Sequence, residues 1–319
     1  MRETVLAPPM TENSVVPMEM REFKLFRSLV HQRTGIWLRD GKQIMLASRL
    51  SRRLRHHGMQ NFADYYDYVQ RNINGDEIRE LINCVTTNKT SFFRERHHFE
   101  FLANTVVPEI RGTVQRGGSR SIRIWSAASS TGEEAYSIVI TLLEALQAQP
   151  GAKAAARPEF AAKRAGLPTL GVSPGGWKIE VVASDIDTAV LEKASRAIYS
   201  EESLETVAAT LQPKYFLRGS GNTQGFVKVK PEIARLVEFK NINLMDPRWP
   251  LEGLFDAIFF RNALIYFNKD TQDNFLRRMA RYLKPNGYLF LGNAEHIPWL
   301  NDVFAPLNQT MYRLRSVAP

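Results

Sequence analysis

Four predicted strands of this chain each end in a segment with polar residues, and such segments can bind a nucleoside-type ligand. They are the loop 126–134, Asp185, the pair Asn243 and Leu244, and the pair Arg261 and Asn262. In an open α/β sheet, ligands bind beyond the carboxyl ends of the strands. A carboxylate there accepts hydrogen bonds from ribose hydroxyl groups, as an acidic residue does in dinucleotide folds. Together the four segments predict a nucleoside pocket.

Each segment also has a purely structural interpretation. The small residues of 126–134 let a ligand approach the backbone, but they lack the GxGxxG pattern and equally suit a tight strand–helix turn. Asp185 is our first choice for a ribose contact, whereas Asp187 better fits the N-cap of a helix starting near Thr188. An Arg261–Asn262 pair is costly to bury without partners, which favours a ligand role over core packing.

Hydrophobic periodicity predicts the elements that position these residues. Apolar residues recur at helical spacing from Met18 onward, and strand-like alternation begins at Ser121. From there, strands alternate with helices, which predicts βαβ units and a mostly parallel, doubly wound α/β sheet. The predicted strands are 121–125, 178–183, 255–260 and 288–291, with a further strand expected before Asn241. The predicted helices are an apolar one that follows Glu134 and runs through Leu146, 188–197 and 271–283.

This pattern divides the chain into four parts. We expect a flexible tail (1–17), an N-terminal helical domain (18–88), a linker that contributes to the pocket (89–120) and an α/β domain (121–319). Two segments interrupt the α/β domain: the Ala-, Pro- and Gly-rich residues 147–176, predicted to be a flexible insertion, and residues 213–239, predicted to form a small antiparallel β subdomain.

Composition narrows the functional classes. The 319 residues carry a formal net charge of +9, which favours an acidic partner such as nucleic acid, anionic lipid or an acidic protein surface. Cys84 is the single cysteine, so no internal disulfide or zinc site built on several thiolates can form, and we expect no metal. Because we find neither an apolar membrane span nor a secretory h-region, we expect a cytoplasmic protein.

Four segments resemble the signature segments of the CheR family of protein-glutamate methyltransferases. They are Thr86–Arg94 (TTNKTSFFR), Trp125–Glu134 (WSAASSTGEE), Ala183–Asp187 (ASDID) and Phe260–Phe267 (FRNALIYF). The resemblance extends from about Phe23 to Tyr312 in the same order. It implies a Rossmann-like class I methyltransferase domain with a small inserted β subdomain. It also implies transfer of methyl from S-adenosylmethionine to glutamates of chemotaxis receptors for sensory adaptation, with S-adenosylhomocysteine as product.

The resemblance also implies roles for individual residues. Arg94 and Tyr266 would lie beside the transferred methyl group as catalytic residues. The implied cofactor-binding residues are Asn88, Thr90, Arg94, Glu133, Asp185, Asn243, Leu244, Arg261 and Asn262. The sequence departs from the family in the 147–176 insertion and at Ser130 and Ala135, and neither departure removes a polar contact.

This reaction suits a site without an acid–base pair. A sulfonium already activates the methyl group, and a glutamate carboxylate with a pKa of about 4.3 is ionised at neutral pH. We therefore expect the chain to align the reacting atoms and exclude water, with Arg94 and Tyr266 orienting the substrate carboxylate. His97 and His98 follow Arg94 but receive no catalytic role.

Two surfaces are predicted to bind the receptor. Lys42, Arg49, Arg52 and Arg53 share one face of a helix, while Ile44, Leu50 and Leu54 supply another, so the cations either dock a glutamate-rich receptor helix or form a solvated face. Residues 213–239 either form a structural hairpin or offer an edge that captures an extended peptide as an added strand, which the resemblance implies to be a receptor carboxyl-terminal pentapeptide. We expect a monomer.

Two other functional classes compete with this interpretation. A nucleic-acid methyltransferase would suit the basic charge, but no aromatic stacking platform interrupts the basic helix, and we find no catalytic Cys or Pro-Pro-Tyr motif. A non-catalytic cofactor-binding scaffold is the third class. The presence of Arg94, Asp185, Asn262 and Tyr266 argues against lost activity.

Overall fold

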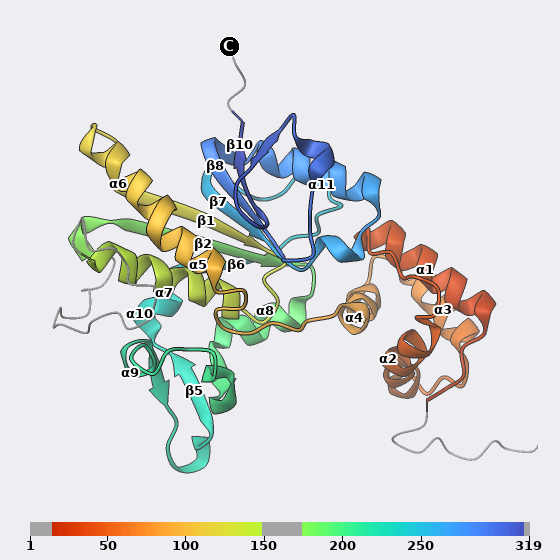
Figure 1. Cartoon of the computed structure of the whole chain (residues 1–319). Helices are drawn as coiled ribbons and strands as arrows, with labels where there is room; N and C mark the ends of the chain where they lie inside the picture. Colours follow the sequence, from red (N-terminus) through yellow and green to blue (C-terminus); the bar gives the residue numbers. More distant parts are fainter. Residues whose placement is uncertain (1–14, 149–173, 316–319) are drawn as a thin grey trace, which may run out of the picture. The chain divides into compact units, whose positions relative to one another are not determined.

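The computed structural model describes residues 15–148 and 174–315 and divides into two units, Met1–Thr87 and Asn88–Pro319 (Figure 1). The predicted tail 1–17 and insertion 147–176 lie almost wholly outside the described residues. Among the helices in the described ranges, none combines the length and the apolar composition that crossing a bilayer requires.

The first unit consists of α1 (Met20–Thr34), α2 (Gln43–His56), α3 (Phe62–Arg71) and α4 (Asp76–Val85). Glu19 and Glu22 form a reciprocal capping box at the start of α1, and Gly35 ends the helix at a φ of 75°, where a residue without a Cβ is favoured. The apolar positions at helical spacing, among them Phe23, Phe26 and Leu50, are fully buried together. An all-helical N-terminal domain was predicted and is confirmed.

Two of the predicted docking cations on α2, Arg49 and Arg53, contact α4 or the chain that follows it. Arg53 forms an ion pair with buried Glu77, which also accepts hydrogen bonds from Tyr65 and His57. Arg49 donates to the carbonyl oxygens of Val85 and Thr86 at the end of α4. Ile44, predicted to lie on an apolar face, is 80% exposed, so that prediction was wrong. The helical spacing was right, but Leu46, Leu50 and Leu54 make the buried stripe and Ile44 falls outside it.

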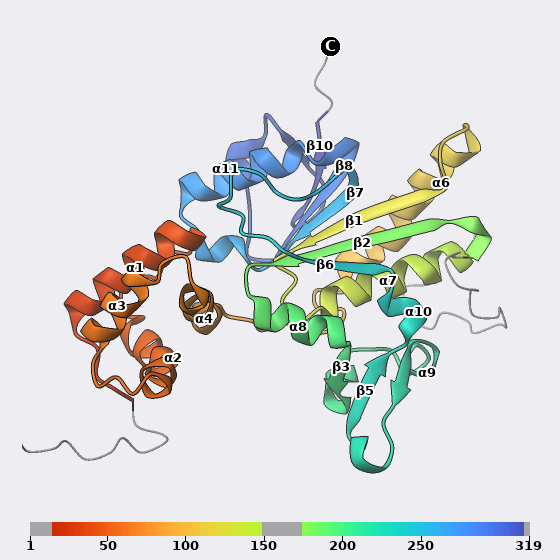
Figure 2. The same ribbon diagram turned by 180° about the vertical axis from the view of Figure 1, so that it is seen from behind.

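The second unit is built on a seven-stranded sheet with the order β6-β2-β1-β7-β8-β10-β9. The first five are parallel, and β10 is antiparallel to both β8 and β9 (Figures 1 and 2). The strands are β1 (Ser121–Ala127), β2 (Lys178–Asp185), β6 (Val237–Asn241), β7 (Phe255–Phe260), β8 (Leu283–Leu291), β9 (Phe304–Pro306) and β10 (Met311–Leu314). The chain progresses outward from β1 through β2 to β6 and, in the other direction, from β7 to β8, beyond which β10 lies between β8 and β9. The boundary between β1 and β7 is therefore the switch point where such sheets bind ligands.

Helices cover both faces of this sheet, because alternate strand residues point to opposite sides. Ala257 and Phe259 of β7 pack with the face that carries α5 to α7, while Ile258 and Phe260 pack with the face that carries α11. The helices are α5 (His97–Phe101), α6 (Val107–Gln115), α7 (Glu133–Gln147), α8 (Thr188–Arg196), α9 (Gln212–Tyr215), α10 (Pro231–Ala234) and α11 (Lys269–Ala280), with a π-helical turn at Leu102–Val106. The doubly wound α/β fold predicted from the sequence is confirmed.

A second, three-stranded antiparallel sheet has the order β3-β5-β4, formed by β3 (Ile198–Ser200), β5 (Phe226–Val229) and β4 (Phe216–Arg218). An inserted antiparallel β subdomain was predicted, but at 213–239. The structure adds β3, whose Tyr199 is buried in the core, and assigns Val237–Asn241 to the main sheet as β6, parallel to β2. A strand of three residues directly after a helix is too short to show a period of two in the sequence.

Candidate functional site

The loop after β1 turns sharply into α7. Ala128 and Ser130 adopt left-handed φ values of 58° and 51°, and Gly132 has a φ of 92°. A Cβ at Gly132 would lie 2.9 Å from the Cβ of Ala194, so no larger residue fits. Glu133, a residue that is 7% exposed, then opens α7, and its carboxylate accepts a hydrogen bond from the Thr131 hydroxyl at 2.6 Å. Burial raises the pKa of Glu133.

The two aspartates at the carboxyl end of β2, Asp185 and Asp187, make different contacts. Asp187 caps α8 by accepting hydrogen bonds from the backbone of Ala189 at 2.9 Å and Val190 at 3.2 Å, which confirms its predicted N-cap role. Asp185 accepts the backbone N–H of Ser130 at 2.9 Å and of Asp187 at 3.0 Å, which ties the β2 end to the β1 loop. Burial raises the pKa of Asp185 to about 6.

Residues 88–95 join the same edge of the sheet. The Asn88 amide donates to Asp187 at 2.8 Å, and the Asn88 carbonyl accepts the Ser130 hydroxyl at 3.2 Å. Phe93 donates its backbone N–H to the hydroxyl of Ser137 at 2.9 Å. The Arg94 guanidinium donates to the Lys89 carbonyl at 2.9 Å. Contacts thus fix both ends of this segment, with Thr90 half-buried between them.

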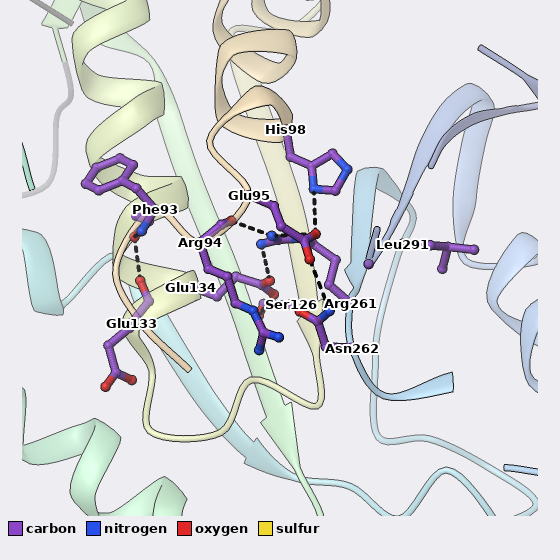
Figure 3. Close-up of polar contacts among 12 residues, drawn as sticks. Phe93, Arg94, Glu95, His98, Ser126, Glu133, Glu134, Arg261, Asn262 and Leu291 are labelled. Atoms are coloured by element: carbon purple, nitrogen blue, oxygen red, sulfur yellow. Dashed lines mark hydrogen bonds and ion pairs between the residues drawn. The ribbon is translucent and has the colours of Figure 1, made fainter. Parts of the chain in front are cut away.

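Arg261, at the end of β7, is the centre of a buried ion cluster (Figure 3). Its side chain is 2% exposed and donates to Glu134 at 2.8 Å and to Glu95 at 3.0 Å. It also donates to the backbone carbonyl of Arg94. Burial opposes ionisation of Glu95, but the charge of Arg261 together with hydrogen bonds from Asn262, Arg261 and the Asn293 backbone keeps the pKa of Glu95 below its usual value. The two terminal nitrogens of the guanidinium are therefore engaged by the protein, and these contacts tie Arg261 to the segment that carries Arg94.

Asn262 is held from two sides. Its backbone adopts a φ of 58° and donates to Glu295 at 2.8 Å, while its amide nitrogen donates to Glu95 at 3.1 Å. Since a carboxylate only accepts, Glu95 fixes which end of the amide carries nitrogen. The side-chain oxygen of Asn262 is the atom left to receive a donor from a ligand.

The remaining predicted residues lie at the ends of β6 and β7. The Asn243 side-chain oxygen accepts the backbone N–H of Met245 at 3.0 Å. Leu244 packs on the core, and its carbonyl accepts from Arg278 at 3.0 Å. Tyr266 is half-buried in the 3-10 turn Leu264–Tyr266 that follows Asn262.

Sequence reasoning missed Glu95, Glu134 and Glu295. Burial of the Arg261–Asn262 pair was taken to favour a ligand, yet these carboxylates supply its partners from within the protein. The one indication that the sequence offered was the predicted burial of Arg261, because a buried arginine needs carboxylates nearby to pair with its charge. His98, given no catalytic role, is fully buried, and burial lowers its pKa to about 2, so it is neutral.

Five non-glycine residues around this edge adopt left-handed backbone conformations: Phe93, Glu95, Ala128, Ser130 and Asn262. Each such conformation is strained by about 1–3 kcal/mol, and strain of this kind concentrates at binding and catalytic sites. The arrangement is a polar, pre-shaped edge with acceptors for donor groups of a ligand and one arginine, Arg94, from the linker segment.

Comparison with known proteins gives two family matches. Residues 88–156 and 171–313 match the model "CheR methyltransferase, SAM binding domain", and residues 21–86 match "CheR methyltransferase, all-alpha domain". A chemotaxis protein methyltransferase of Salmonella typhimurium is 42% identical over 92% of this chain and 89% of its own length. One from Escherichia coli is 40% identical over 98% and 96%. Chemotaxis protein methyltransferase 2 of Pseudomonas aeruginosa is 39% identical over 95% and 96%.

Proposed function

Because this chain belongs to the CheR family of methyltransferases and carries its S-adenosylmethionine-binding domain, we propose that it methylates glutamate side chains of chemotaxis receptors. The products would be glutamate methyl esters and S-adenosylhomocysteine. The observation that supports this most is the convergence of Asp185, Asn262 and Arg94 at one edge of the sheet, joined by the Ser130, Glu95 and Arg261 contacts. None of the three side chains forms an acid–base pair, which agrees with a nucleophile that is already ionised.

The residues fit this cofactor. Asp185 would accept hydrogen bonds from the ribose hydroxyls, and the oxygen of Asn262 with Glu133 would receive the ammonium of the methionine end. Asn243 and Leu244 would frame the adenine, and Asn88 and Thr90 would cover it from the linker. When bound, the sulfonium supplies an activated methyl group.

The chain's own residues then orient the substrate. Arg94 would align the incoming carboxylate through a charge-assisted hydrogen bond, and Tyr266 would add a weaker one from its hydroxyl. Pairing that is too strong would stabilise the ground state, so a half-buried arginine suits the task better than a fully buried one. No proton needs to move, and the site's remaining work is to exclude water.

The direct experiment is transfer of labelled methyl from S-adenosylmethionine to a receptor cytoplasmic fragment, followed by mild alkali. A glutamate methyl ester releases volatile methanol under these conditions. Label on RNA but not on protein would instead favour a nucleic-acid methyltransferase. Cofactor binding without any labelled product would favour a scaffold.

Cofactor affinity is expected to decrease as the pH falls below about 6, because protonation of Asp185 removes an acceptor. The pKa of Asp185 in the folded protein is raised from the usual 3.8 to about 6. Between these two pH values the chain therefore takes up a proton at Asp185 when it folds. Asp185 therefore destabilises the fold above pH 6, and this cost disappears as the pH falls toward 4. Calorimetric titration of S-adenosylhomocysteine from pH 5 to 8 measures the effect. Asp185→Asn should bind weakly with no step near pH 6, and an unchanged step in that variant would contradict the assignment.

Receptor docking on α2 rests on fewer cations than the sequence predicted. Arg49 and Arg53 are engaged with α4, whereas Lys42 and Arg52 are exposed. Charge reversal at Lys42 and Arg52 together should raise the KM for the receptor about 5- to 10-fold and leave kcat nearly unchanged. Exposed charges at the edge of an interface mainly change the rate at which the two partners associate. Arg71→Glu is the control, since Arg71 is an exposed cation on α3. An unaltered KM would exclude docking on this face. Reversal of Arg53 would not test docking, because it breaks the pair with buried Glu77.

The small sheet is the second proposed receptor contact. Its outer strands, β3 and β4, each pair with β5 on one side. An extended receptor pentapeptide could add to either edge through backbone hydrogen bonds. The turn from Gly219 to Gly225 follows β4, and Gly225 adopts a φ of 85°.

A further inference from the structure

Glu295 is a buried carboxylate that the proposed reaction does not use. It lies in the loop after β8 and is 4% exposed. One oxygen accepts the backbone N–H of Gly292 at 2.6 Å and of Asn262 at 2.8 Å. The other accepts the backbone N–H of Ile265 at 3.3 Å. Burial raises the pKa of Glu295, and these N–H groups oppose that shift.

The three donors belong to two loops. Gly292 begins the loop after β8, while Asn262 and Ile265 belong to the loop after β7, which we name the Asn262 loop (residues 261–267). The Asn262 loop carries Asn262 and Tyr266, both proposed site residues. Asn262 itself is left-handed, a conformation that the local chain does not favour and that surrounding contacts must impose.

Gly292 provides an independent observation of the same close fit. A Cβ at this position would lie 2.8 Å from the backbone nitrogen of Asn262 and 2.9 Å from the Oε2 atom of Glu295. It would also contact the amide nitrogen of Asn262. The backbone of β8 must therefore approach the Asn262 loop without a side chain between them, so that the glutamate can reach both loops.

We propose that Glu295 is a positioning residue, which holds the Asn262 loop in its ligand-binding shape before the cofactor arrives. Glu95 fixes the Asn262 side chain, as Figure 3 shows. Glu295 fixes the Asn262 backbone, so the direction of the Asn262 oxygen is set by two carboxylates from different parts of the chain. A preformed loop loses less conformational freedom on binding, and this smaller entropy cost increases the affinity for the ligand. This inference rests on the proposed role of Asn262.

The test is Glu295→Gln, which keeps the shape of the side chain but replaces one acceptor oxygen with a donor. A donor would then face at least one of the three backbone N–H groups. Affinity for S-adenosylhomocysteine, measured by calorimetry, should fall about 10-fold or more, because hydrogen bonds to a charged group are lost. In the ligand-free protein, the backbone amides of Asn262 and Gly292 should exchange with deuterium faster, while those of α7 stay protected. Glu252→Gln is the control, since Glu252 is exposed.

Two further variants keep the test decisive. Glu295→Asp retains the carboxylate and should recover part of the affinity, whereas a residue that only fills space would be replaced better by glutamine. Gly292→Ala disturbs the same fit from β8 and should also lower affinity and speed exchange at Asn262. Wild-type affinity and exchange in Glu295→Gln, or in Gly292→Ala if the first does not fold, would overturn the proposal. Since these measurements need no receptor, they stay informative even if receptor methylation fails.

Discussion

Replacing Arg94 with alanine is expected to lower kcat by about 10²-fold, the loss typical of a reacting group that is no longer held in line. The backbone carbonyl of Arg94 is held by Arg261 and its guanidinium by Lys89, so the side chain starts from a fixed position. Steady-state kinetics with a receptor fragment gives kcat and KM separately. Arg94→Lys should give an intermediate kcat, because it keeps the charge and loses the planar fork.

Lys89→Ala provides the matched control for Arg94. Lys89 is an exposed cation in the same segment, and only its backbone carbonyl contacts Arg94. We expect near-normal turnover in this variant. If Arg94→Ala also retained near-normal turnover, Arg94 would have no part in orienting the carboxylate, and the proposed role of Tyr266 would need a separate test.

Replacing Arg261 with methionine is expected to destabilise the second unit by about 3–5 kcal/mol, because it leaves two buried carboxylates without their cation. Glu95 and Glu134 side chains are only 10% and 12% exposed. Urea denaturation measures the free energy of unfolding. The triple variant Arg261→Met, Glu95→Gln, Glu134→Gln should recover most of that loss, since it removes all three charges together.

Arg261→Met should also reduce turnover in whatever fraction stays folded, since the carbonyl of Arg94 loses its donor. If Arg261→Met had the same free energy of unfolding as the wild type, the interpretation of a buried ion cluster that stabilises the fold would be contradicted. The guanidinium of Arg261 lies over the Phe99 ring, 5.5 Å from its centre. If the triple variant lost as much free energy of unfolding as Arg261→Met, this packing would matter more than the charges.

The parallel sheet, and the gathering of polar residues at one of its edges, could be predicted from the sequence because both follow from local patterns. Strands 121–125 and 255–260 have clear apolar patterns, and the polar residues that follow them come to one edge once the strands are parallel. The Asp187 cap was predictable for the same reason. Its partners at Ala189 and Val190 lie two and three residues away.

Contacts between distant residues could not be predicted in this way. Glu95 meets Arg261 across 166 positions of the chain, and no periodicity reports such a pair. On α2, helical spacing grouped Arg49, Arg52 and Arg53, but it could not show that α4 engages Arg49 and Arg53 while Arg52 stays exposed. The exposed Ile44 is the same kind of error, because a helix pattern gives faces and not the neighbours that bury them.

The position of β10 has a consequence for synthesis on the ribosome. β10 pairs on one side with β8 and on the other with β9, although it follows both in the chain. Until Met311–Leu314 has emerged, the nascent sheet has an unpaired edge at β8, next to the loop that carries Glu295. Such edges recruit other strands, so a stalled or truncated chain is exposed to aggregation. The edge of the sheet beside the loop that carries Glu295 therefore gains its final support only when Met311–Leu314 has paired with β8.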